Sequence, residues 1–259
     1  MSPLVRNLQR ILRPLELTPL HPQWLVLRHR QETGAWVKAH ARGRLLDIGC
    51  GNGRLRHELG DGVDYIGIDY PTTVALGYVP TADILADAAR LPVATASVDV
   101  VTLLDVLEHL PAPERALAEA ARVLRTGGRC LIHVPFLYPL HDEPHDFQRW
   151  TRHGLERLLA AHGFEVVELR ETTSPLEAAA ALLTMAIAAA LVGQPRGLPL
   201  RLLLAPLVVV LIVAINLLGW IGTMLPHASP FMSFSYRVLA LRAAGSPDGA
   251  SVPAGSART

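Results

Sequence analysis

Short apolar runs alternate with amphipathic stretches from residue 44 to about residue 173. The apolar runs predict buried strands, because each is short, rich in branched side chains and bounded by turn-forming residues. They are Arg44–Ile48, Tyr65–Ile68, Val98–Leu104 and Arg129–Val134. The amphipathic stretches Pro113–Leu124 and Thr151–His162 predict helices. Strands that alternate with helices indicate a doubly wound α/β domain, with a parallel sheet covered on both faces.

A different pattern follows residue 173. Ala178–Gly193 is an uncharged run of 16 residues, and Leu202–Leu225 is an uncharged run of 24 residues. As helices they would be ~24 Å and ~36 Å long, against a bilayer core of about 30 Å. Phe234–Leu241 then returns to a strand-like pattern. The two runs therefore predict an apolar helical hairpin inserted before the last strand.

The strands on either side of this hairpin are expected to join one sheet, so the chain must leave and return on the same side. A hairpin or a shallow dip into a membrane satisfies this condition, whereas a single crossing does not. Arg196 and Arg201 lie near the turn of the hairpin, and basic residues tend to stay on the cytoplasmic side, which favours a shallow dip. The alternative is a soluble helical cap, buried in a dimer or over the active site.

These patterns divide the chain into four predicted parts. They are an N-terminal helical extension (1–43), a ligand-binding α/β core (44–173 with 231–243), the apolar hairpin (174–230) and a disordered tail (244–259). The extension carries leucines at near-helical spacing with arginines between them, which is typical of a helix that lies on an anionic membrane or packs on the next domain.

Composition supports a role for apolar residues beyond a globular core. Half of the 259 residues are hydrophobic, and only 18% are charged, against roughly 25% in soluble domains. With 24 basic and 23 acidic residues, the net charge of +1 gives no indication of nucleic-acid binding. Cys50 and Cys130 are too few for a disulfide framework. The N-terminus shows no secretory signal pattern, so we expect a protein on the cytoplasmic side of the membrane, or a cytoplasmic one.

The sharpest motif is LLDIGCGNG over residues 45–53, where a buried strand turns through Gly49, Gly51 and Gly53. Glycines permit a tight turn and let a ligand approach the backbone closely. An NAD-binding loop would instead read G-x-G-x-x-G. Asp47 beside the loop indicates a ligand with a cationic or hydrogen-donating end. An ordinary strand-to-helix turn is the alternative.

Two further carboxylates follow in order along the chain. Asp69 ends the second predicted strand, 22 residues after Asp47. A carboxylate about 20 residues further along the chain, at the end of a neighbouring strand, typically accepts hydrogen bonds from the two hydroxyls of a ribose. Asp87, in the segment ADAARLP, is expected just before a strand, where it could bind an adenine amino group.

The region from Arg44 to Leu169 resembles the class I S-adenosylmethionine-dependent methyltransferases, specifically the type 11 family. The resemblance rests on LLDIGCGNGRL, YIGIDY, ADAARLP, SVDVVTLLDVLEHLPAPERALAEAARVLRTGG, CLIHVPF and LLAAHGFEVVEL. It implies a Rossmann-like, mostly parallel, seven-stranded sheet with one antiparallel strand, for which Phe234–Leu241 is the candidate. It also implies the cofactor S-adenosyl-L-methionine.

By this resemblance, the cofactor site consists of eight residues. They are Asp47, Gly49, Gly51, Gly53, Asp69, Asp87, Ala88 and Asp105. The glycines would line the methionine part of the cofactor, with Asp47 near its ammonium group. Asp69 would bind the ribose hydroxyls and Asp87 the adenine amino group, while Ala88 would lie beside the ring. Asp105 would lie where cofactor and acceptor meet.

Histidines are the candidate bases for the acceptor, because an unperturbed imidazole titrates near neutral pH. We favour His109 and His141, since both follow carboxyl ends of strands, the edge at which doubly wound sheets bind ligands. His145 and His133 are further candidates. A purely structural role for His109 is the alternative.

A metal site is a weaker interpretation. Asp105, Glu108 and His109 have i, i+3 and i+4 spacing, which would place them on one helical face. Some quinone-type O-methyltransferases that resemble this region hold a divalent cation in such a cluster. The segment His141–Asp146 is also rich in ligand-type side chains, but without a regular spacing. Methyl transfer does not need a metal, so we expect none and interpret this segment as a substrate-facing loop.

The sequence thus predicts a methyltransferase at the cytoplasmic face of the cell membrane, in contact with the membrane through residues 174–230. Its expected acceptor is a small molecule or a lipid-linked one, of the glycan or quinone type, and not a nucleic acid. The alternatives are a soluble small-molecule methyltransferase with a hydrophobic cap, a non-catalytic membrane scaffold, and an NAD-dependent oxidoreductase, which the G-x-G-x-G spacing disfavours.

Overall fold

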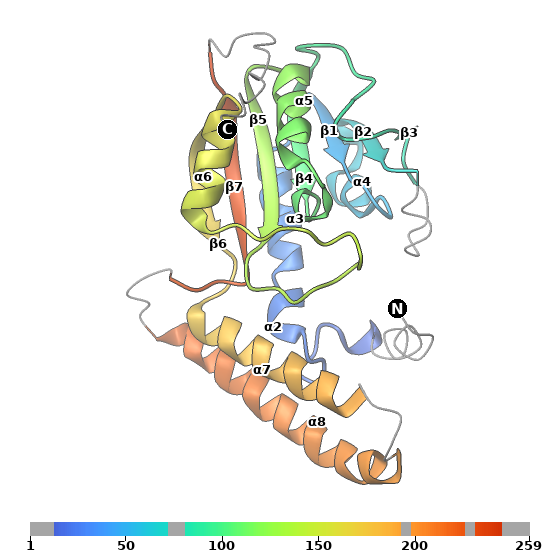
Figure 1. The fold of residues 1–259 in the computed structure, drawn as a ribbon, viewed down its shortest axis with the longest axis vertical. Coiled ribbons are helices and arrows are strands. Elements are labelled where there is room, and N and C mark those ends of the chain that lie inside the picture. The colour runs from blue at the N-terminus through green and yellow to red at the C-terminus, as the bar shows by residue number, and fades with distance from the viewer. Residues whose placement is uncertain (1–12, 72–80, 193–197, 226–230, 245–259) are drawn as a thin grey trace, which may run out of the picture.

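The structure, a computed structural model, describes residues 13–71, 81–192, 198–225 and 231–244. A seven-stranded sheet runs through the described residues in the order β3-β2-β1-β4-β5-β7-β6 (Figure 1). Its strands are β1 (Arg44–Ile48), β2 (Asp64–Asp69), β3 (Ile84–Leu85), β4 (Val98–Leu104), β5 (Leu124–Pro135), β6 (Phe164–Glu171) and β7 (Ser235–Arg242). Strand β7 is antiparallel to both of its neighbours, and the other pairs are parallel. The predicted mostly parallel sheet with one antiparallel strand is confirmed.

The helices connect and cover these strands. They are α2 (Trp24–Leu27), α3 (Arg30–His40), α4 (Arg54–Leu59), α5 (Pro113–Val123), α6 (Arg152–Ala161), α7 (Pro175–Val192) and α8 (Leu198–Ile221). Short 3-10 turns occur at Arg13–Leu15, Gly60–Gly62, Leu107–His109 and Gly222–Met224. Most of the predicted N-terminal helix (1–12), the hairpin turn (193–197) and the predicted disordered tail (245–259) lie outside the described residues.

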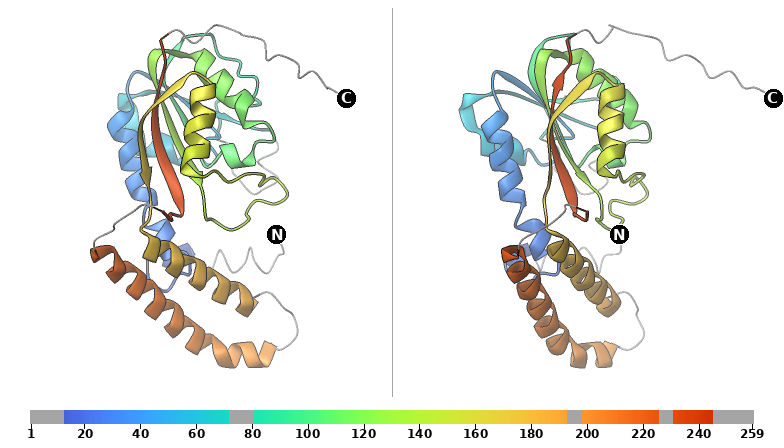
Figure 2. Two further views of the ribbon diagram at one scale, coloured as in Figure 1. Left: turned by 60° about the vertical axis from the view of Figure 1, so that its left-hand side comes forward. Right: turned by 90° about the vertical axis from the view of Figure 1, so that its left-hand side faces the viewer.

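The strands bury both of their faces. Alternate residues of a strand point to opposite sides, so Leu46 packs into the cluster under α5 and α6, while Leu45 packs into the cluster under α3 and α4. Val101 and Val100 of β4 divide in the same way. Helices therefore cover both faces, as Figure 2 shows in its right-hand view. This arrangement explains why the strands read as continuous apolar runs rather than as alternating patterns.

The apolar hairpin projects from one end of the sheet. It consists of α7 and α8 and connects β6 to β7, which pair directly, with Glu171 opposite Tyr236. The chain thus leaves and returns at the same end of the sheet (Figure 2). At its base the packing is tight, because a Cβ on Gly219 would lie 2.6 Å from the Cβ of Ala180 and 2.8 Å from Cδ1 of Leu25.

Candidate functional site

The glycine loop joins β1 to α4 at the carboxyl edge of the sheet. Gly49, Gly51 and Gly53 have φ angles of 77°, 53° and 67°, a region that side chains other than glycine rarely adopt. A Cβ on Gly49 would also lie 2.4 Å from Cγ2 of Val106. The loop therefore requires glycine for its backbone conformation, and it lies directly against the segment that follows β4.

Asp47 lies within β1, beneath this loop, and is buried. Its Oδ2 accepts a hydrogen bond from the Tyr65 hydroxyl at 2.5 Å, and its Oδ1 accepts one from the Thr102 hydroxyl at 2.6 Å. Burial raises the pKa of Asp47 to about 6, although the two hydroxyl groups partly oppose this shift. The carboxylate is therefore ionised near neutral pH and held in one orientation from both neighbouring strands.

Asp69, at the end of β2, ties that strand to the glycine loop. Its Oδ2 accepts a hydrogen bond from the backbone N–H of Gly51 at 3.0 Å, and its Oδ1 accepts one from the N–H of Tyr70 at 2.7 Å. A carboxylate oxygen can accept more than one hydrogen bond. These contacts position the side chain and leave it able to accept hydroxyl donors.

Asp87 does not precede a strand, and that expectation was wrong. It follows the two-residue strand β3, and the next strand starts only at Val98. The sequence signal failed because so short a strand has no detectable periodicity. Asp87 accepts a hydrogen bond from the N–H of Ala89 at 2.8 Å, and Ala88 is buried in the main core. Asp47, Asp69 and Asp87 thus belong to the carboxyl ends of three adjacent strands.

Asp105 is not on a helical face with Glu108 and His109, so that interpretation was also wrong. Asp105 has a φ of 56°, and only Leu107–His109 form a 3-10 turn. The N–H of Asp105 donates to the carbonyl oxygen of His133, and its Oδ1 lies 2.7 Å from Nδ1 of the same histidine. The loop after β4 is thereby fastened to β5, because Asp105 turns toward the neighbouring strand.

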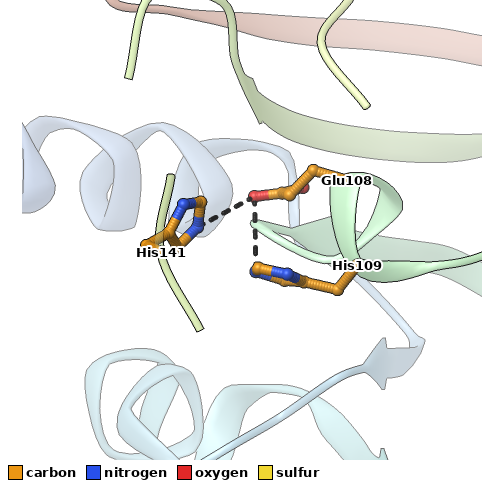
Figure 3. Close-up of side chains that lie close together, drawn as sticks. All are labelled: Glu108, His109 and His141. Carbon is orange, nitrogen blue, oxygen red and sulfur yellow. Dashed lines mark ion pairs between the residues drawn. The ribbon is translucent and has the colours of Figure 1, made fainter. Parts of the chain in front are cut away.

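His109 and His141 come together around Glu108, although 32 residues separate the two histidines in sequence (Figure 3). The Nε2 atoms of His109 and His141 lie 3.8 Å and 3.9 Å from Oε1 of Glu108. Their rings meet edge to face, with centroids 4.7 Å apart. Glu108 is completely buried, and neither of its carboxylate oxygens has a hydrogen-bond partner among the described residues. Burial, with the nearby Asp105, raises the pKa of Glu108 well above its usual range.

The third predicted base, His145, contributes its backbone rather than its ring. Its carbonyl oxygen lies 2.7 Å from Nδ1 of His109, whereas its ring packs against Phe147. From the sequence, Glu108 and Asp146 were considered only as possible metal ligands, and Arg149 was given no role. The spacing Asp146-x-x-Arg149 was the available signal, but it occurs in many loops.

Arg149 fixes the loop that carries His141. Its guanidinium binds both oxygens of Asp146, at 2.5 Å and 2.7 Å, and donates to the carbonyl oxygens of Tyr138 and Pro139. This pairing lowers the pKa of Asp146 to about 2. Asp146 in turn accepts the backbone N–H of His141 at 3.0 Å. The position of His141 is therefore set by a closed network and not by a helix or strand.

Comparison with known proteins shows the family to which this chain belongs. The family described as "Methyltransferase domain" matches residues 46–132, which include the glycine loop and the segment after β4. The ubiquinone biosynthesis O-methyltransferase of Burkholderia thailandensis is 30% identical over 169 residues, which cover 53% of this chain and 72% of that protein. The chain belongs to the class I S-adenosylmethionine-dependent methyltransferases of the type 11 family.

Another relative matches a smaller part of the chain. The 27-O-demethylrifamycin SV methyltransferase of Amycolatopsis mediterranei is 39% identical over 108 residues, and the match covers 37% of this chain and 40% of that protein. Among solved structures, the complex of a Haloferax volcanii methyltransferase with its activator contains a chain with a TM-score of 0.52 at 16% identity, which covers 93% of this chain and 96% of that one. This likeness supports the methyltransferase fold alone.

Proposed function

We propose that this chain is an S-adenosylmethionine-dependent methyltransferase that acts on a lipophilic acceptor at a membrane. The observation that carries the proposal is the edge formed by β1, β2 and β3. Three glycines with positive φ lie there beside the carboxylates of Asp47 and Asp69. A cofactor with an ammonium group, a ribose and an adenine fits this edge, because each part meets a suitable acceptor or a backbone without a Cβ.

The proposed roles at this edge follow the chemistry of the residues. Gly49, Gly51 and Gly53 admit the methionine part of the cofactor, and Asp47 faces its ammonium group. Asp69 accepts the ribose hydroxyls, for which its contacts with the loop have already oriented it.

Asp87 is proposed to accept the adenine amino group, and Ala88 to lie beside the ring. When bound, S-adenosylmethionine supplies a methyl group on a sulfonium, which a nucleophile displaces in line. Much of the rate enhancement in such a reaction comes from alignment of the two reactants. His109 and His141 lie at the acceptor side, where both aim Nε2 at one space. An imidazole nitrogen that carries no hydrogen has a lone pair. This lone pair can receive the proton of an acceptor hydroxyl, or it can hold a cation that activates the hydroxyl.

The contacts of α8 support membrane insertion. Its span from Leu203 to Met224 has a mean hydropathy of 2.6 and is long and apolar enough to cross a membrane, and only 17% of it is buried in the protein. A core helix of a soluble protein would pass the same test of composition, but it would be mostly buried. The exposed side chains form an apolar surface: Leu203, Leu207, Val210, Leu211, Leu218, Ile221 and Met224. Soluble monomers rarely expose so large an apolar patch.

The inward side of the hairpin includes polar and small residues beside apolar ones. Asn216 is completely buried, and its Nδ2 donates to the carbonyl oxygens of Pro19 at 2.8 Å and His21 at 3.0 Å. Thr184 of α7 is also buried and donates to the carbonyl oxygen of Pro22 at 2.6 Å. Helices in membranes place small and polar residues at helix contacts and apolar residues toward lipid. The hairpin follows this rule.

The hairpin also connects to the acceptor side of the site. Leu25 of α2, Ala178 of α7 and Phe234 form one apolar cluster with Leu137 and Tyr138, which begin the His141 loop. The ring of Tyr138 contacts that of His141 edge to face, with centroids 5.0 Å apart. Apolar packing therefore joins the hairpin to the loop that carries His141, which supports a lipophilic acceptor at this side of the site. One relative is named for ubiquinone biosynthesis, which is consistent with such an acceptor.

Calorimetry with S-adenosylmethionine tests the cofactor site. Asp69→Ala removes charge-assisted hydrogen bonds worth about 1.5–3 kcal/mol each, so we expect at least tenfold weaker binding. Asp64→Ala is a matched control, because Asp64 lies on the same strand but is exposed and pairs with Arg44. Equal affinities of the two variants would remove Asp69 from the site.

The acceptor is tested with labelled S-adenosylmethionine and two pools, extracted membrane lipids and water-soluble metabolites. Label in the lipid pool supports the proposal. Label only in the soluble pool, together with a dimer that covers α8, would support the alternative in which the hairpin is a hydrophobic cap.

A further inference from the structure

Asp47 is a buried carboxylate whose hydrogen-bond partners are neutral. Its two oxygens accept hydrogen bonds from the hydroxyl groups of Tyr65 and Thr102, at 2.5 Å and 2.6 Å. Among the residues that the structure describes, no arginine, lysine or histidine forms an ion pair with it. Burial of a charge is unfavourable unless hydrogen bonds or an opposite charge compensate for it. At Asp47 the protein supplies the hydrogen bonds but not the opposite charge.

The neighbouring cation, Arg56 of α4, pairs with a different carboxylate. Its guanidinium lies over the ring of Tyr65, with Cζ 4.6 Å from the ring centroid, and forms an ion pair with Asp83. Asp83 is itself held in place, because its Oδ2 accepts the backbone N–H of Gly67 at 2.8 Å. Arg56 therefore packs on the tyrosine ring while its charge is paired with Asp83, and Asp47 keeps its negative charge for a ligand.

The Tyr65 hydroxyl can act only as a donor to Asp47. Burial, together with the charge of Asp47, raises the pKa of the tyrosine, so the hydroxyl stays protonated near neutral pH. The ring reaches the carboxylate beside Gly67, which lies opposite Asp47 in the pairing of β1 with β2. A Cβ on Gly67 would lie 3.2 Å from Cε1 of Tyr65, closer than nearly all Cβ contacts in proteins. Glycine at this position therefore gives the ring its room.

Thr102 supports Asp47 from the other neighbouring strand. It is completely buried in β4 and lies opposite Asp47 in the parallel pairing of β1 with β4. A buried hydroxyl needs a hydrogen-bond partner, which the carboxylate oxygen provides. Each oxygen of Asp47 thus receives a donor from a different strand. An ionised carboxylate has about four sites for hydrogen bonds, so it can still accept the ammonium group of a ligand.

We propose that Tyr65 and Thr102 are positioning residues for cofactor binding, which hold the Asp47 carboxylate in its orientation and keep it charged toward the ammonium group of S-adenosylmethionine. The inference rests on the proposed function, which places that ammonium group at Asp47. Neutral donors suit this task, because they stabilise the ionised carboxylate and leave its charge uncancelled. An arginine or lysine in their place would compete with the ammonium group for the same charge.

The two hydroxyl groups act on a carboxylate that titrates close to neutral pH. Burial raises the pKa of Asp47 to about 6, and the hydrogen bonds from Thr102 and Tyr65 oppose this shift. Loss of either donor should therefore raise the pKa of Asp47 further. Asp47 is charged above its pKa and neutral below it, so the affinity for an ammonium group should fall as the pH drops through this value. The midpoint of that fall reports the pKa of Asp47.

The remaining ionisable groups that face Asp47 are a carboxylate, a guanidinium and a thiol: Asp69, Arg56 and Cys50. Asp69 raises the pKa of Asp47, and Arg56 lowers it. Burial raises the pKa of Cys50 to about 12, so its thiol is neutral near pH 6. These three side chains stay unchanged when Tyr65 or Thr102 is substituted, so a shift of the midpoint would report the lost hydroxyl group.

Calorimetry on the full-length chain in detergent, from about pH 5 to about pH 8, tests the inference with two compounds. S-adenosylhomocysteine carries the ammonium group, whereas 5′-methylthioadenosine has the same adenosine and sulfur without it. Wild-type affinity for the first should fall with pH around a midpoint of about 6, and affinity for the second should not follow this change. Tyr65→Phe and Thr102→Val should each raise the midpoint for S-adenosylhomocysteine by about one pH unit.

Two further variants separate positioning from folding. Thr102→Ser keeps the hydroxyl and should retain the wild-type midpoint. Tyr236→Phe is the matched control, because Tyr236 is a buried tyrosine of the same sheet that packs in the core on the opposite face. Its midpoint should equal that of the wild type. Unchanged affinity for 5′-methylthioadenosine shows that each variant has folded around an intact adenosine site.

The outcomes separate this inference from the proposed function. Unmoved midpoints in both Tyr65→Phe and Thr102→Val would overturn the inference, although the cofactor still binds. An equal pH dependence of the two compounds in the wild type would also overturn it, because the titrating group would then not face the ammonium group. A wild type that binds neither compound would contradict the proposed function, and the inference with it.

Discussion

Helix α5 buries Ala116, Leu117 and Ala120 against the sheet, while Glu114 and Arg115 face outward. Helix α8 differs, because it buries Asn216 beside Ile212 and exposes Leu207, Val210 and Leu218. The hydrophobic effect sorts apolar residues away from water. The outward face of α8 is therefore apolar where that of α5 is charged. If the proposed membrane insertion holds, the two helices of one chain are sorted against different solvents.

The largest effect is expected from charges on the outer face of the hairpin. Leu207→Arg and Val210→Arg together should release the protein from membranes, because an arginine near the centre of a membrane helix costs about 2.5–3.5 kcal/mol. Flotation of membranes after a high-salt wash measures this. Val167→Arg, at an exposed position of β6, is the control and should leave the distribution unchanged. A wild-type protein that stays soluble and monomeric without detergent would contradict the proposal that α8 faces lipid while α5 faces water.

The same substitution should have different effects in the two regions. Leu117→Ala opens a cavity in the completely buried core and should lower the free energy of unfolding by about 2–5 kcal/mol. Leu207→Ala removes an exposed side chain and should change it by no more than about 0.5 kcal/mol in detergent. Denaturant unfolding of the two variants measures the difference. Similar losses would mean that Leu207 is packed against protein.

Asn216→Leu makes α8 more apolar and should nevertheless destabilise the protein. It leaves the carbonyl oxygens of Pro19 and His21 without their donor, at a cost of about 1–3 kcal/mol. The change should appear as a lower melting temperature in detergent. Leu218→Ile, at an exposed position of the same helix, is the control. Stabilisation by Asn216→Leu would show that this buried face is not held by its polar contacts.

The smallest effect concerns the cofactor and pH. Burial raises the pKa of Asp47 to about 6, so its carboxylate is ionised above that pH and becomes neutral as the pH falls through it. An ionised Asp47 attracts the ammonium group of the cofactor, so affinity should fall by about tenfold, or ~1.4 kcal/mol, between pH 7 and pH 5. Calorimetry at the two pH values measures this, and Asp47→Asn should show a flatter dependence. Membrane binding of the hairpin should not follow this change.

Local pattern was sufficient for much of the core. The strand Val98–Leu104 was predicted with its observed bounds, and Gly49, Gly51 and Gly53 have the positive φ angles that the motif required. These features depend on backbone sterics and on short-range periodicity, which sequence records directly. Strand β3 was missed because its two residues are too few to show a periodic pattern.

The amino-acid sequence was sufficient to predict the family, the glycine loop, the order of the three carboxylates and the two long uncharged runs. The packing of the folded chain brings His141 to Glu108 and turns Asp105 to His133 instead. It also decided that Asn216 lies on the inward face of α8. These contacts join residues far apart in the chain, so they depend on how β4, β5 and the hairpin pack and on which partners satisfy buried polar groups. No local pattern contains that information.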